Sequence, residues 1–388
     1  MGDHTTPVEL IADPLALLRT RTSSKWATYP SDVLPMFVAE MDFPVAPEIA
    51  ARLVDMIARS DLGYDGGASG VGEAFAGYAH DSWGWDLEPR DVATTTNVVV
   101  ALTELVRAAI EPGDGVVINS PVYPPFFTLI REAGGKVVDV PLQETSPTRW
   151  ELDLDGIEAA FRDGARAYVL CHPHNPLGLV HSREQLARVA ELAAQYGVLV
   201  LSDEIHGPLT HSDADFTPYL AVSEAAREHG IAVTSASKSF NLPALGCAFW
   251  VPGGPAARAR IARLPESVTH RTGHFGAQAA AVAFARSRDW LAAAVTAIEA
   301  NRRRLGELIA ELLPDAIYHE PRASYLGWID FRPLGWGDDP SRRILDEARV
   351  ALTPGRAFGE IGRGFARLNF GCSPEVLEEG IRRIAALR

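Results

Sequence analysis

A lysine and an aspartate each follow an apolar run typical of a buried strand, and together they could do carbonyl chemistry. Asp203 follows the run 198–202, and Lys238 follows the run 232–235 within the sequence Ser-Ala-Ser-Lys. In open α/β sheets, ligands bind beyond the carboxyl ends of the strands. A lysine that is desolvated at such an edge is a nucleophile toward a carbonyl carbon. A lone strand-end aspartate often caps a helix and a lone loop lysine is usually solvated, so their shared position is the informative feature.

Alternating strand and helix patterns must position these two residues. Between about residues 46 and 250, short apolar runs typical of strands covered on both faces alternate with helical periods. The alternation predicts an α/β layer with a mainly parallel sheet. The expected helices are 46–59, 72–83, 98–110, 182–196 and 218–228, and the expected strands are 91–95, 115–119, 136–140, 165–171, 198–202, 232–235 and 246–251.

The last third of the chain reads differently. Residues 273–313, rich in Ala, Arg and Leu, predict a long helix that leads out of the large domain. Beyond it, an α+β unit is expected, with strands 326–331 and 365–370 and helices 341–349 and 374–387. We expect an N-terminal arm over 1–45 that packs on the small domain, a large domain over 46–285 and a small domain over 286–388.

Composition excludes several classes of protein. The formal net charge of −14 over 388 residues argues against a nucleic-acid partner, because phosphate binding needs a basic face. Three widely spaced cysteines do not suggest a disulfide framework or a zinc site, and the prolines among His172, His174 and His181 break any helical ligand spacing, so no metal is expected. Neither a secretory signal nor an apolar run of about 18 residues is visible, so we expect a cytoplasmic protein with no membrane contact.

The remaining motifs gain their meaning from their order. They are CHPHNPLGLV (171–180), LSDEIHGPL (201–209), SASKSFNLPALG (235–246) and FARLNFGCS (365–373), with LPMFVAEMDFPVAPEI (34–49), GYDGG (63–67) and INSPVYPPF (118–126). Over essentially its whole length the chain resembles fold-type I pyridoxal-phosphate (PLP) enzymes of the class I/II aminotransferase superfamily, and more narrowly its MalY/PatB-like cystathionine β-lyase branch. The resemblance implies an α/β large domain with a mainly parallel seven-stranded sheet, a smaller α+β domain, and PLP as cofactor.

The resemblance also implies roles for the residues around the cofactor ring. Lys238 holds PLP as a Schiff base and moves the proton at the substrate Cα. Asp203 pairs with the pyridine nitrogen and keeps it protonated. Asn175 and His206 hydrogen-bond the phenolic oxygen, and Tyr123 stacks on the ring.

The phosphate is expected at the start of a helix. Backbone amides of Val98 and Val99 and the hydroxyls of Ser235 and Ser237 are the expected donors. Tyr64 is expected to reach the phosphate of a neighbouring subunit, which implies a homodimer with shared sites.

The substrate residues follow from the same resemblance. Arg367 is the expected clamp for the α-carboxylate of an amino acid, because its planar fork matches a carboxylate. Ala39, Tyr325 and the turn 41–43 are expected to line the side-chain pocket.

The chain departs from the family pattern at the rim of the site. His172, Leu179 and His181 replace the usual residues around the Asn-Pro motif, and Asn97 replaces a usual glycine. Gly246 stands where many aminotransferases have an arginine for the phosphate, an absence that the lyase branch shares.

The function implied by the resemblance is carbon–sulfur β-elimination on L-cystathionine or another L-cysteine S-conjugate, giving a thiol, pyruvate and ammonia. The altered rim leaves open an aminotransferase or a decarboxylating enzyme for a specialised amino acid. A regulatory binding protein on this fold is a third alternative, against which the retained Lys238, Asp203, Asn175 and Arg367 argue.

Overall fold

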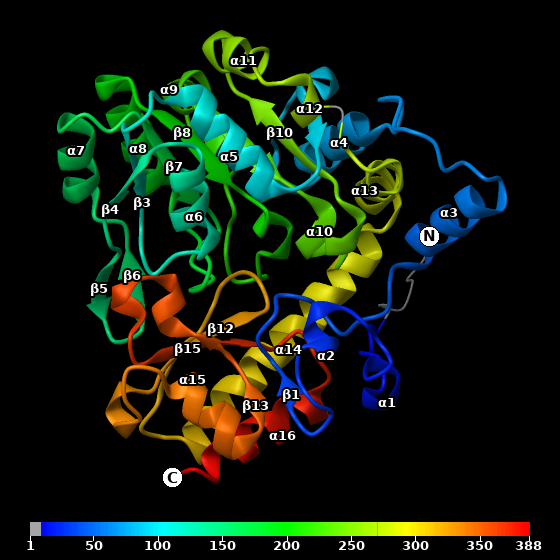
Figure 1. The fold of residues 1–388 in the computed structure, drawn as a ribbon, viewed down its shortest axis with the longest axis vertical. Coiled ribbons are helices and arrows are strands. Elements are labelled where there is room, and N and C mark those ends of the chain that lie inside the picture. The colour runs from blue at the N-terminus through cyan, green and yellow to red at the C-terminus, as the bar shows by residue number, and fades with distance from the viewer. Residues whose placement is uncertain (1–8, 270) are drawn as a thin grey trace, which may run out of the picture.

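A seven-stranded sheet forms the centre of the larger part of the molecule (Figure 1), in a computed structural model that describes residues 9–269 and 271–388. The strand order is β2-β10-β9-β8-β7-β3-β4. Neighbouring strands from β9 to β4 pair in parallel, and β10 pairs antiparallel with both β9 and β2. The predicted, mainly parallel seven-stranded sheet is therefore confirmed. Its strands are β2 (Ala93–Thr95), β3 (Gly115–Ile118), β4 (Lys136–Asp139), β7 (Ala167–Cys171), β8 (Leu199–Asp203), β9 (Gly230–Thr234) and β10 (Ala248–Pro252).

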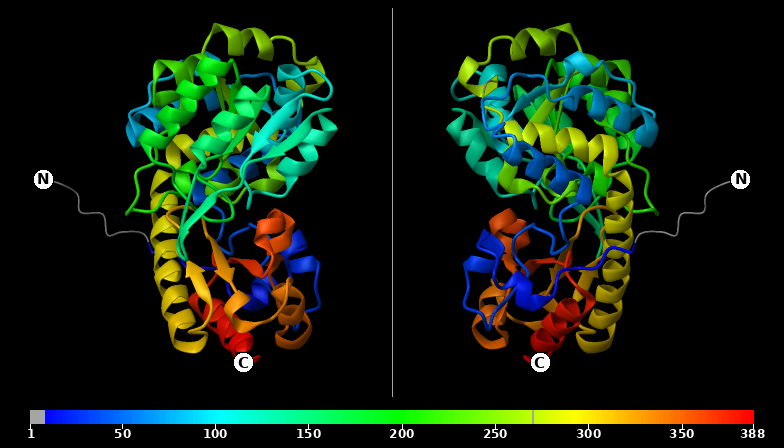
Figure 2. Two further views of the ribbon diagram at one scale, coloured as in Figure 1. Left: turned by 90° about the vertical axis from the view of Figure 1, so that its left-hand side faces the viewer. Right: turned by 90° about the vertical axis from the view of Figure 1, so that its right-hand side faces the viewer.

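Successive strand residues point into two cores, one on each face of this sheet. In β3, Val116 and Ile118 pack in one core, while Val117 packs in the other, as the two-residue period of a strand requires. Helices cover both faces (Figure 2), which explains why the central strands are buried throughout and largely apolar. The helices of this part are α3 (Pro47–Ala58), α4 (Val71–Trp83), α5 (Val98–Ala109), α6 (Pro125–Glu132), α7 (Leu154–Arg162), α8 (Arg183–Tyr196), α9 (Glu224–Glu228), α10 (Ala236–Ser239), α11 (Pro255–Ile261), α12 (Glu266–Thr269) and α13 (His274–Arg286).

A four-stranded antiparallel sheet forms the centre of the smaller part. Its order is β11 (Ile317–His319), β12 (Leu326–Asp330), β15 (Phe365–Asn369) and β14 (Thr353–Pro354). The long helix α14 (Arg288–Leu312) runs along one side of the molecule from the larger part into the smaller one (Figure 2). The smaller part also contains α15 (Pro340–Arg343), a π-helix over Ile344–Ala348, and α16 (Pro374–Ala385).

The N-terminal segment packs on this smaller part. Strand β1 (Leu34–Pro35) pairs in parallel with β13 (Val350–Ala351), and the short helices α1 (Leu15–Leu18) and α2 (Ser24–Ala27) precede it. Residues 1–8, the start of the predicted arm, lie outside the described residues. Within the described part of the chain, no helix is long and apolar enough to cross a membrane.

Three predicted helices are wrong in extent. The single helix predicted over 273–313 is two helices, because the chain leaves helical geometry at Ser287, whose hydroxyl bonds Glu48. The helix predicted over 218–228 begins at Glu224, because Ser223 is its N-cap, and a 3-10 turn precedes it. The helix predicted over 341–349 is the short α15 followed by the π-helix.

Smaller differences lie at strand and loop positions. The strand predicted over 91–95 begins only at Ala93, since Pro89–Asp91 form a 3-10 turn. Helices α6 and α7 were not predicted, and neither was the hairpin of β5 (Gln143–Ser146) and β6 (Arg149–Glu151).

Candidate active site

A cavity of about 680 Å³ lies at the carboxyl ends of β7, β8 and β9. Its lining joins residues from distant parts of the sequence. From the predicted set, the structure brings together Ala39, Val98, Val99, Tyr123, Asn175, Asp203, His206, Ser235, Ser237, Lys238 and Arg367.

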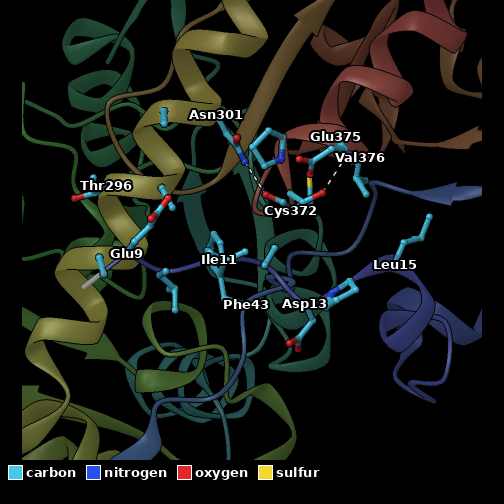
Figure 3. Close-up of a pocket in the computed structure, with 18 of the residues that line it drawn as sticks. Glu9, Ile11, Asp13, Leu15, Phe43, Thr296, Asn301, Cys372, Glu375 and Val376 are labelled. Atoms are coloured by element: carbon cyan, nitrogen blue, oxygen red, sulfur yellow. Dashed lines mark hydrogen bonds between the residues drawn. The ribbon is translucent and has the colours of Figure 1, made fainter. Parts of the chain in front are cut away.

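A larger cavity of about 1130 Å³ lies elsewhere, between the N-terminal segment, α14 and the start of α16 (Figure 3). It is lined by apolar side chains such as Leu10 and Phe43 and by several carboxylates. Of the predicted site residues it contains only Phe43, from the turn 41–43, so size alone does not identify the chemical site.

Lys238 reaches the smaller cavity from the one-turn helix α10, directly after β9. The Ser235 hydroxyl fixes this turn, since it accepts the Ser237 amide at 3.0 Å and donates to the Cys247 carbonyl at 2.6 Å. The Lys238 Nζ donates to the Ala39 carbonyl at 2.8 Å. Burial lowers the pKa of Lys238 to about 8, the Arg367 charge acts in the same direction, and Glu40 and Asp203 oppose it. An appreciable fraction of this amine is therefore neutral and nucleophilic near neutral pH.

Asp203 is the last residue of β8 and is 4% exposed. Its Oδ1 accepts the Ile205 amide at 3.2 Å. Burial raises the pKa of Asp203 to about 7, against the effect of the Ile205 amide and of Lys238. A cationic partner inside the cavity would lower the pKa of Asp203 again, because a neighbouring positive charge stabilises the carboxylate form.

Arg367 is a buried cation with no carboxylate partner among the described residues. It is 6% exposed, and its Nη1 donates to Asn175 Oδ1 at 3.0 Å and its Nη2 to the Phe37 carbonyl at 3.0 Å. The guanidinium carbon lies 5.0 Å from the centre of the Phe358 ring, and the buried Nε has no hydrogen-bond acceptor in the part of the chain that the structure describes. Burial lowers the pKa of Arg367 to about 10. An unpaired buried charge costs free energy, so the site is built to receive an anion.

His206 and Tyr123 complete the inner wall. His206 is 4% exposed and its Nδ1 has no hydrogen-bond partner among the described residues. Burial, with the charges of Lys238 and Arg367, lowers the pKa of His206 to about 3, so the imidazole is neutral. Burial raises the pKa of Tyr123, so its phenol is also neutral.

The start of α5 offers free backbone donors. Asn97 is the N-cap, and its Oδ1 accepts the Val100 amide at 2.9 Å. This explains the departure from glycine, because an asparagine side chain satisfies one of the helix's first amides. The amides of Val98 and Val99 have no partner among the described residues and line the cavity, as an anion site at a helix start requires.

Three expectations about the site need correction, those for Tyr325, Ser235 and the turn 41–43. Tyr325 does not line the cavity, because its hydroxyl turns to the Ala39 carbonyl at 2.9 Å. The Ser235 hydroxyl already donates to Cys247 and fixes the loop instead. The turn 41–43 is absent from the lining, because Met41 and Phe43 are buried in the core. Tyr64 is fully exposed, away from the cavity of its own chain, and its predicted role across a subunit interface stays a prediction.

Sequence reasoning missed several residues of the lining. Phe37 and Val38 line the cavity beside Ala39, and Thr353 donates to the Phe37 carbonyl at 2.8 Å. Phe37 and Val38 stand in a motif that was recognised, which could have indicated them. Thr353 comes into the site through the pairing of β14 with β15, for which the sequence holds no signal.

The histidines that depart from the family pattern lie behind this cavity rather than in it. The His172 and His181 rings stack with centres 5.4 Å apart, and the His174 ring lies 6.0 Å from that of His181. Burial lowers the pKa of His174 to about 3 and that of His181 to about 4. Within the described residues, no group of three His, Cys, Asp or Glu side chains is arranged to hold a metal ion.

The model of the family "Aminotransferase class I and II" matches residues 40–384. The chain belongs to this family. Its similar proteins include a putative cystathionine beta-lyase of Mycobacterium tuberculosis (strain ATCC 25618 / H37Rv), 40% identical with 94% of each chain covered. Cystathionine beta-lyase PatB of Bacillus subtilis (strain 168) is 33% identical with 92% of each chain covered. The crystal structure of a putative PLP-dependent beta-cystathionase from Corynebacterium diphtheriae has a TM-score of 0.93 at 33% identity, covering 97% of this chain and 98% of that one. The predicted family and fold class are confirmed.

Proposed function

We propose that this chain is a PLP-dependent carbon–sulfur β-lyase that cleaves L-cystathionine or another L-cysteine S-conjugate to a thiol, pyruvate and ammonia. The likeness to proteins named cystathionine beta-lyase, at up to 40% identity over nearly the whole chain, supports this reaction class. The observation that carries the proposal is Arg367, a buried cation without a carboxylate partner in residues 9–269 and 271–388, in the same cavity as a lysine amine of lowered pKa. In this arrangement Arg367 can bind the carboxylate of an amino acid, while the Lys238 amine in the same cavity can accept or donate a proton.

The residues of the cavity fit PLP. Free donors and acceptors face it: the unpartnered His206 Nδ1, the amides at the start of α5, and the buried carboxyl of Asp203. When bound, the cofactor withdraws electrons from the substrate Cα, which makes the Cα proton removable and lets a group leave from Cβ. In this proposal Lys238 holds the cofactor covalently, Asp203 pairs with the ring nitrogen, and the other holding residues are Asn175 and His206 at the ring oxygen, Tyr123 at the ring face, and Val98, Val99 and Ser237 at the phosphate.

Each protein residue has a separate task in the reaction. Arg367 binds the α-carboxylate through its planar fork and so orients Cα toward Lys238. The amino group of the substrate first displaces Lys238 from the cofactor and so frees its amine. The Lys238 amine then takes the proton from Cα, and its Nζ is held by the Ala39 carbonyl, as in the structure. The carbon–sulfur bond then breaks, Lys238 returns a proton to the departing sulfur, and water converts the three-carbon product to pyruvate and ammonia.

We further propose a cytoplasmic homodimer in which Tyr64 serves the partner's site. Support comes from the exposed apolar side chains of Val54, Ile57 and Leu62, which stand near Tyr64 in the sequence and are each more than 60% exposed. We also propose that each subunit of this dimer consists of an arm over 1–45, a large domain over 46–285 and a small domain over 286–388. Light scattering on the purified protein tests the dimer directly.

Product analysis tests the reaction. The purified protein is given L-cystathionine, S-substituted L-cysteines, L-alanine and L-glutamate, each with and without a 2-oxo acid. A lyase releases thiol, ammonia and pyruvate in equal amounts from the sulfur compounds without a 2-oxo acid, and nothing from alanine or glutamate. A requirement for the 2-oxo acid establishes the aminotransferase alternative, and release of carbon dioxide establishes decarboxylation.

A further inference from the structure

Residues 37–42 form a strap that is neither helix nor strand, and its first three residues, Phe37, Val38 and Ala39, line the cavity. Each of its carbonyls accepts a hydrogen bond, and most of the donors are side chains rather than a neighbouring strand. The donors are Thr353 and Arg367 to Phe37, Asn369 and the Glu40 amide to Val38, Lys238 and Tyr325 to Ala39, Lys25 and Asn369 to Glu40, Asn241 to Met41, and the Asp13 amide to Asp42. The position of the Ala39 carbonyl therefore depends on named side chains.

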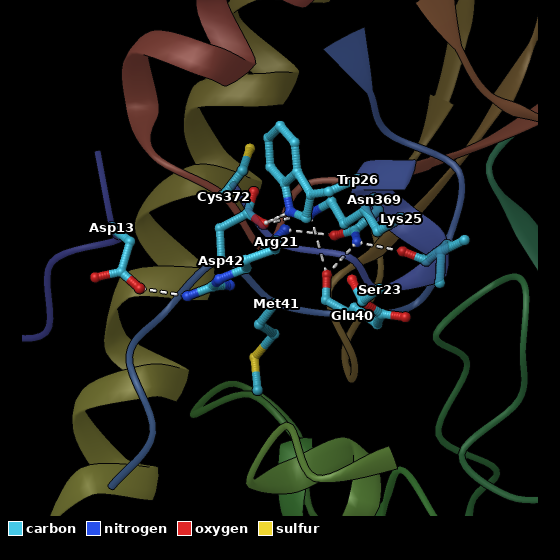
Figure 4. Close-up of polar contacts among 12 residues, drawn as sticks. Asp13, Arg21, Ser23, Lys25, Trp26, Glu40, Met41, Asp42, Asn369 and Cys372 are labelled. Carbon is cyan, nitrogen blue, oxygen red and sulfur yellow. Dashed lines mark hydrogen bonds and ion pairs between the residues drawn. The ribbon is translucent and has the colours of Figure 1, made fainter. Parts of the chain in front are cut away.

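The first of these is Lys25, which forms a fully buried ion pair with Asp42 (Figure 4). Their side chains are both 1% exposed, and Lys25 Nζ lies 2.9 Å from Asp42 Oδ1. Lys25 Nζ also donates to the Glu40 carbonyl at 3.1 Å, and Trp26 Nε1 donates to Asp42 Oδ1 at 3.2 Å. Buried pairs give little net stability because both charges lose their hydration. What this pair fixes is the course of the strap just after Ala39.

The second is Asn241, three residues after Lys238 on the same loop. Its Oδ1 accepts the Met41 amide at 2.9 Å and its Nδ2 donates to the Met41 carbonyl at 2.8 Å. Asn241 has φ 55°, a left-handed conformation that asparagine and glycine adopt readily. The loop that carries Lys238 is thus tied to the strap by two backbone contacts from one side chain.

We propose that Lys25 and Asn241 are positioning residues, which hold the Ala39 carbonyl on the Lys238 amine and so stabilise its protonated form. The proposal rests on the proposed function, because it explains how the proton taken from Cα is kept in place. Ala39 contributes a neutral backbone acceptor, which no ionisable side chain in the strap could replace without changing the charge of the site.

Other charges around Lys238 also affect the proton affinity of its amine, so the Ala39 carbonyl acts together with them. Arg367 disfavours the ammonium form, while Glu40 and Asp203 favour it. The neutral His206 lines the same cavity, and the Tyr325 ring, which does not line it, lies next to His206. A strap that moves takes both the Ala39 carbonyl and the Glu40 carboxylate with it. The amine then loses proton affinity, because Arg367, which is also held by Asn175 outside the strap, still disfavours the ammonium form.

Two kinds of variant separate positioning from folding. The double variant Lys25→Met, Asp42→Leu replaces the pair by apolar side chains of similar size, a change that often preserves stability. Asn241→Gly removes both contacts to Met41 and tolerates the positive φ, and Asn241→Asp retains only the contact to the Met41 amide. Arg304→Met, Glu378→Gln is the matched control, because this pair joins α14 to α16 outside the cavity.

The measurement is competitive acetylation of the full-length, cofactor-free chain between pH 6 and 10, read by peptide mass. The chain has only three lysines, and the exposed Lys136 is an internal reference. The wild-type Lys238 midpoint is expected at about 8. A hydrogen bond to a charged group contributes about 1.5–3 kcal/mol, so the double variant and Asn241→Gly should lower the midpoint by roughly one to two pH units. Asn241→Asp should give an intermediate shift and the control none.

Steady-state kinetics of the loaded enzyme give a second readout. The kcat for an S-conjugate should fall about tenfold or more in the double variant and in Asn241→Gly, with little change in KM, because carboxylate binding is retained. Wild-type midpoints and kcat in folded Asn241→Gly overturn the proposal, even where the double variant does not fold. If instead the wild type itself releases no thiol, the proposed function fails, while the labelling result still decides whether the strap controls Lys238.

Discussion

Replacing Arg367 by methionine should impair substrate binding without destabilising the protein. Methionine keeps an unbranched apolar side chain in place of the methylene part of Arg367 and removes the charged group. Arg367 is 6% exposed and has no carboxylate partner among the described residues. The variant therefore separates a residue kept for a ligand from one kept for the fold.

The magnitude follows from burial. A pKa lowered from 12.5 to about 10 corresponds to about 3 kcal/mol against the charged form. Methionine removes that cost but leaves Asn175 Oδ1 without its donor, which costs about 1–3 kcal/mol. The Phe37 carbonyl keeps its bond from Thr353. The net change in the free energy of unfolding should lie between about 0 and 2 kcal/mol in favour of the variant.

Urea unfolding and steady-state kinetics measure the two sides of this prediction. Loss of charge-assisted contacts to the carboxylate should raise the KM for an S-conjugate by about tenfold to a hundredfold, with a smaller loss in kcat. Arg367→Lys is the matched control, because it keeps the charge and loses the fork, and it should recover only part of the affinity. A variant that is clearly less stable than wild type but has an unchanged KM would show that Arg367 supports the fold and binds no carboxylate.

Three further changes test other parts of the site. Asp203→Asn should depress kcat even at saturating substrate. In the cofactor-free protein, burial holds the folded-state pKa of Asp203 near 7, so the wild type loses the stability that the protonated carboxyl contributes as pH rises. Urea unfolding should therefore show the stability of the variant relative to wild type rising by up to about 4 kcal/mol between pH 4 and 7, and a constant difference contradicts the assignment. His181→Leu should shift the midpoint of acid unfolding to lower pH. The buried imidazole has a pKa of about 4, so the stability that its neutral form contributes in the wild type is lost as pH falls below 6.5. Circular dichroism measures this midpoint, and an unchanged value refutes the prediction. Tyr64→Phe should weaken retention of the cofactor in a dilution assay without changing the cavity of its own chain, and equal retention argues against a shared site.

The part of the site that lies on the large sheet could be predicted from the sequence. Asp203 and Lys238 follow buried strands, and parallel strands bring their ends to one edge, so residue type and position were sufficient. The resemblance added Asn175, His206 and Arg367, which the structure places around the same cavity.

The rest depends on contacts between distant segments. The Tyr325 and Ser235 hydroxyls turn to backbone carbonyls of Ala39 and Cys247, and only the folded chain determines which carbonyl lies within reach. The break at Ser287 has the same origin, because its hydroxyl meets Glu48 from a helix 239 residues away in the sequence. The sequence pattern of a short segment does not indicate which distant residues will form hydrogen bonds with it.

Reductive fixation of the cofactor tests the central claim most directly. The protein is incubated with PLP, reduced with borohydride, digested and analysed by mass spectrometry, and only the three lysines Lys25, Lys136 and Lys238 can carry the product on a side chain. The account predicts the pyridoxyl mass on the peptide that contains Lys238 and none in Lys238→Ala. Labelling of Lys25 or Lys136 instead, or a labelled Lys238→Ala variant, would contradict it.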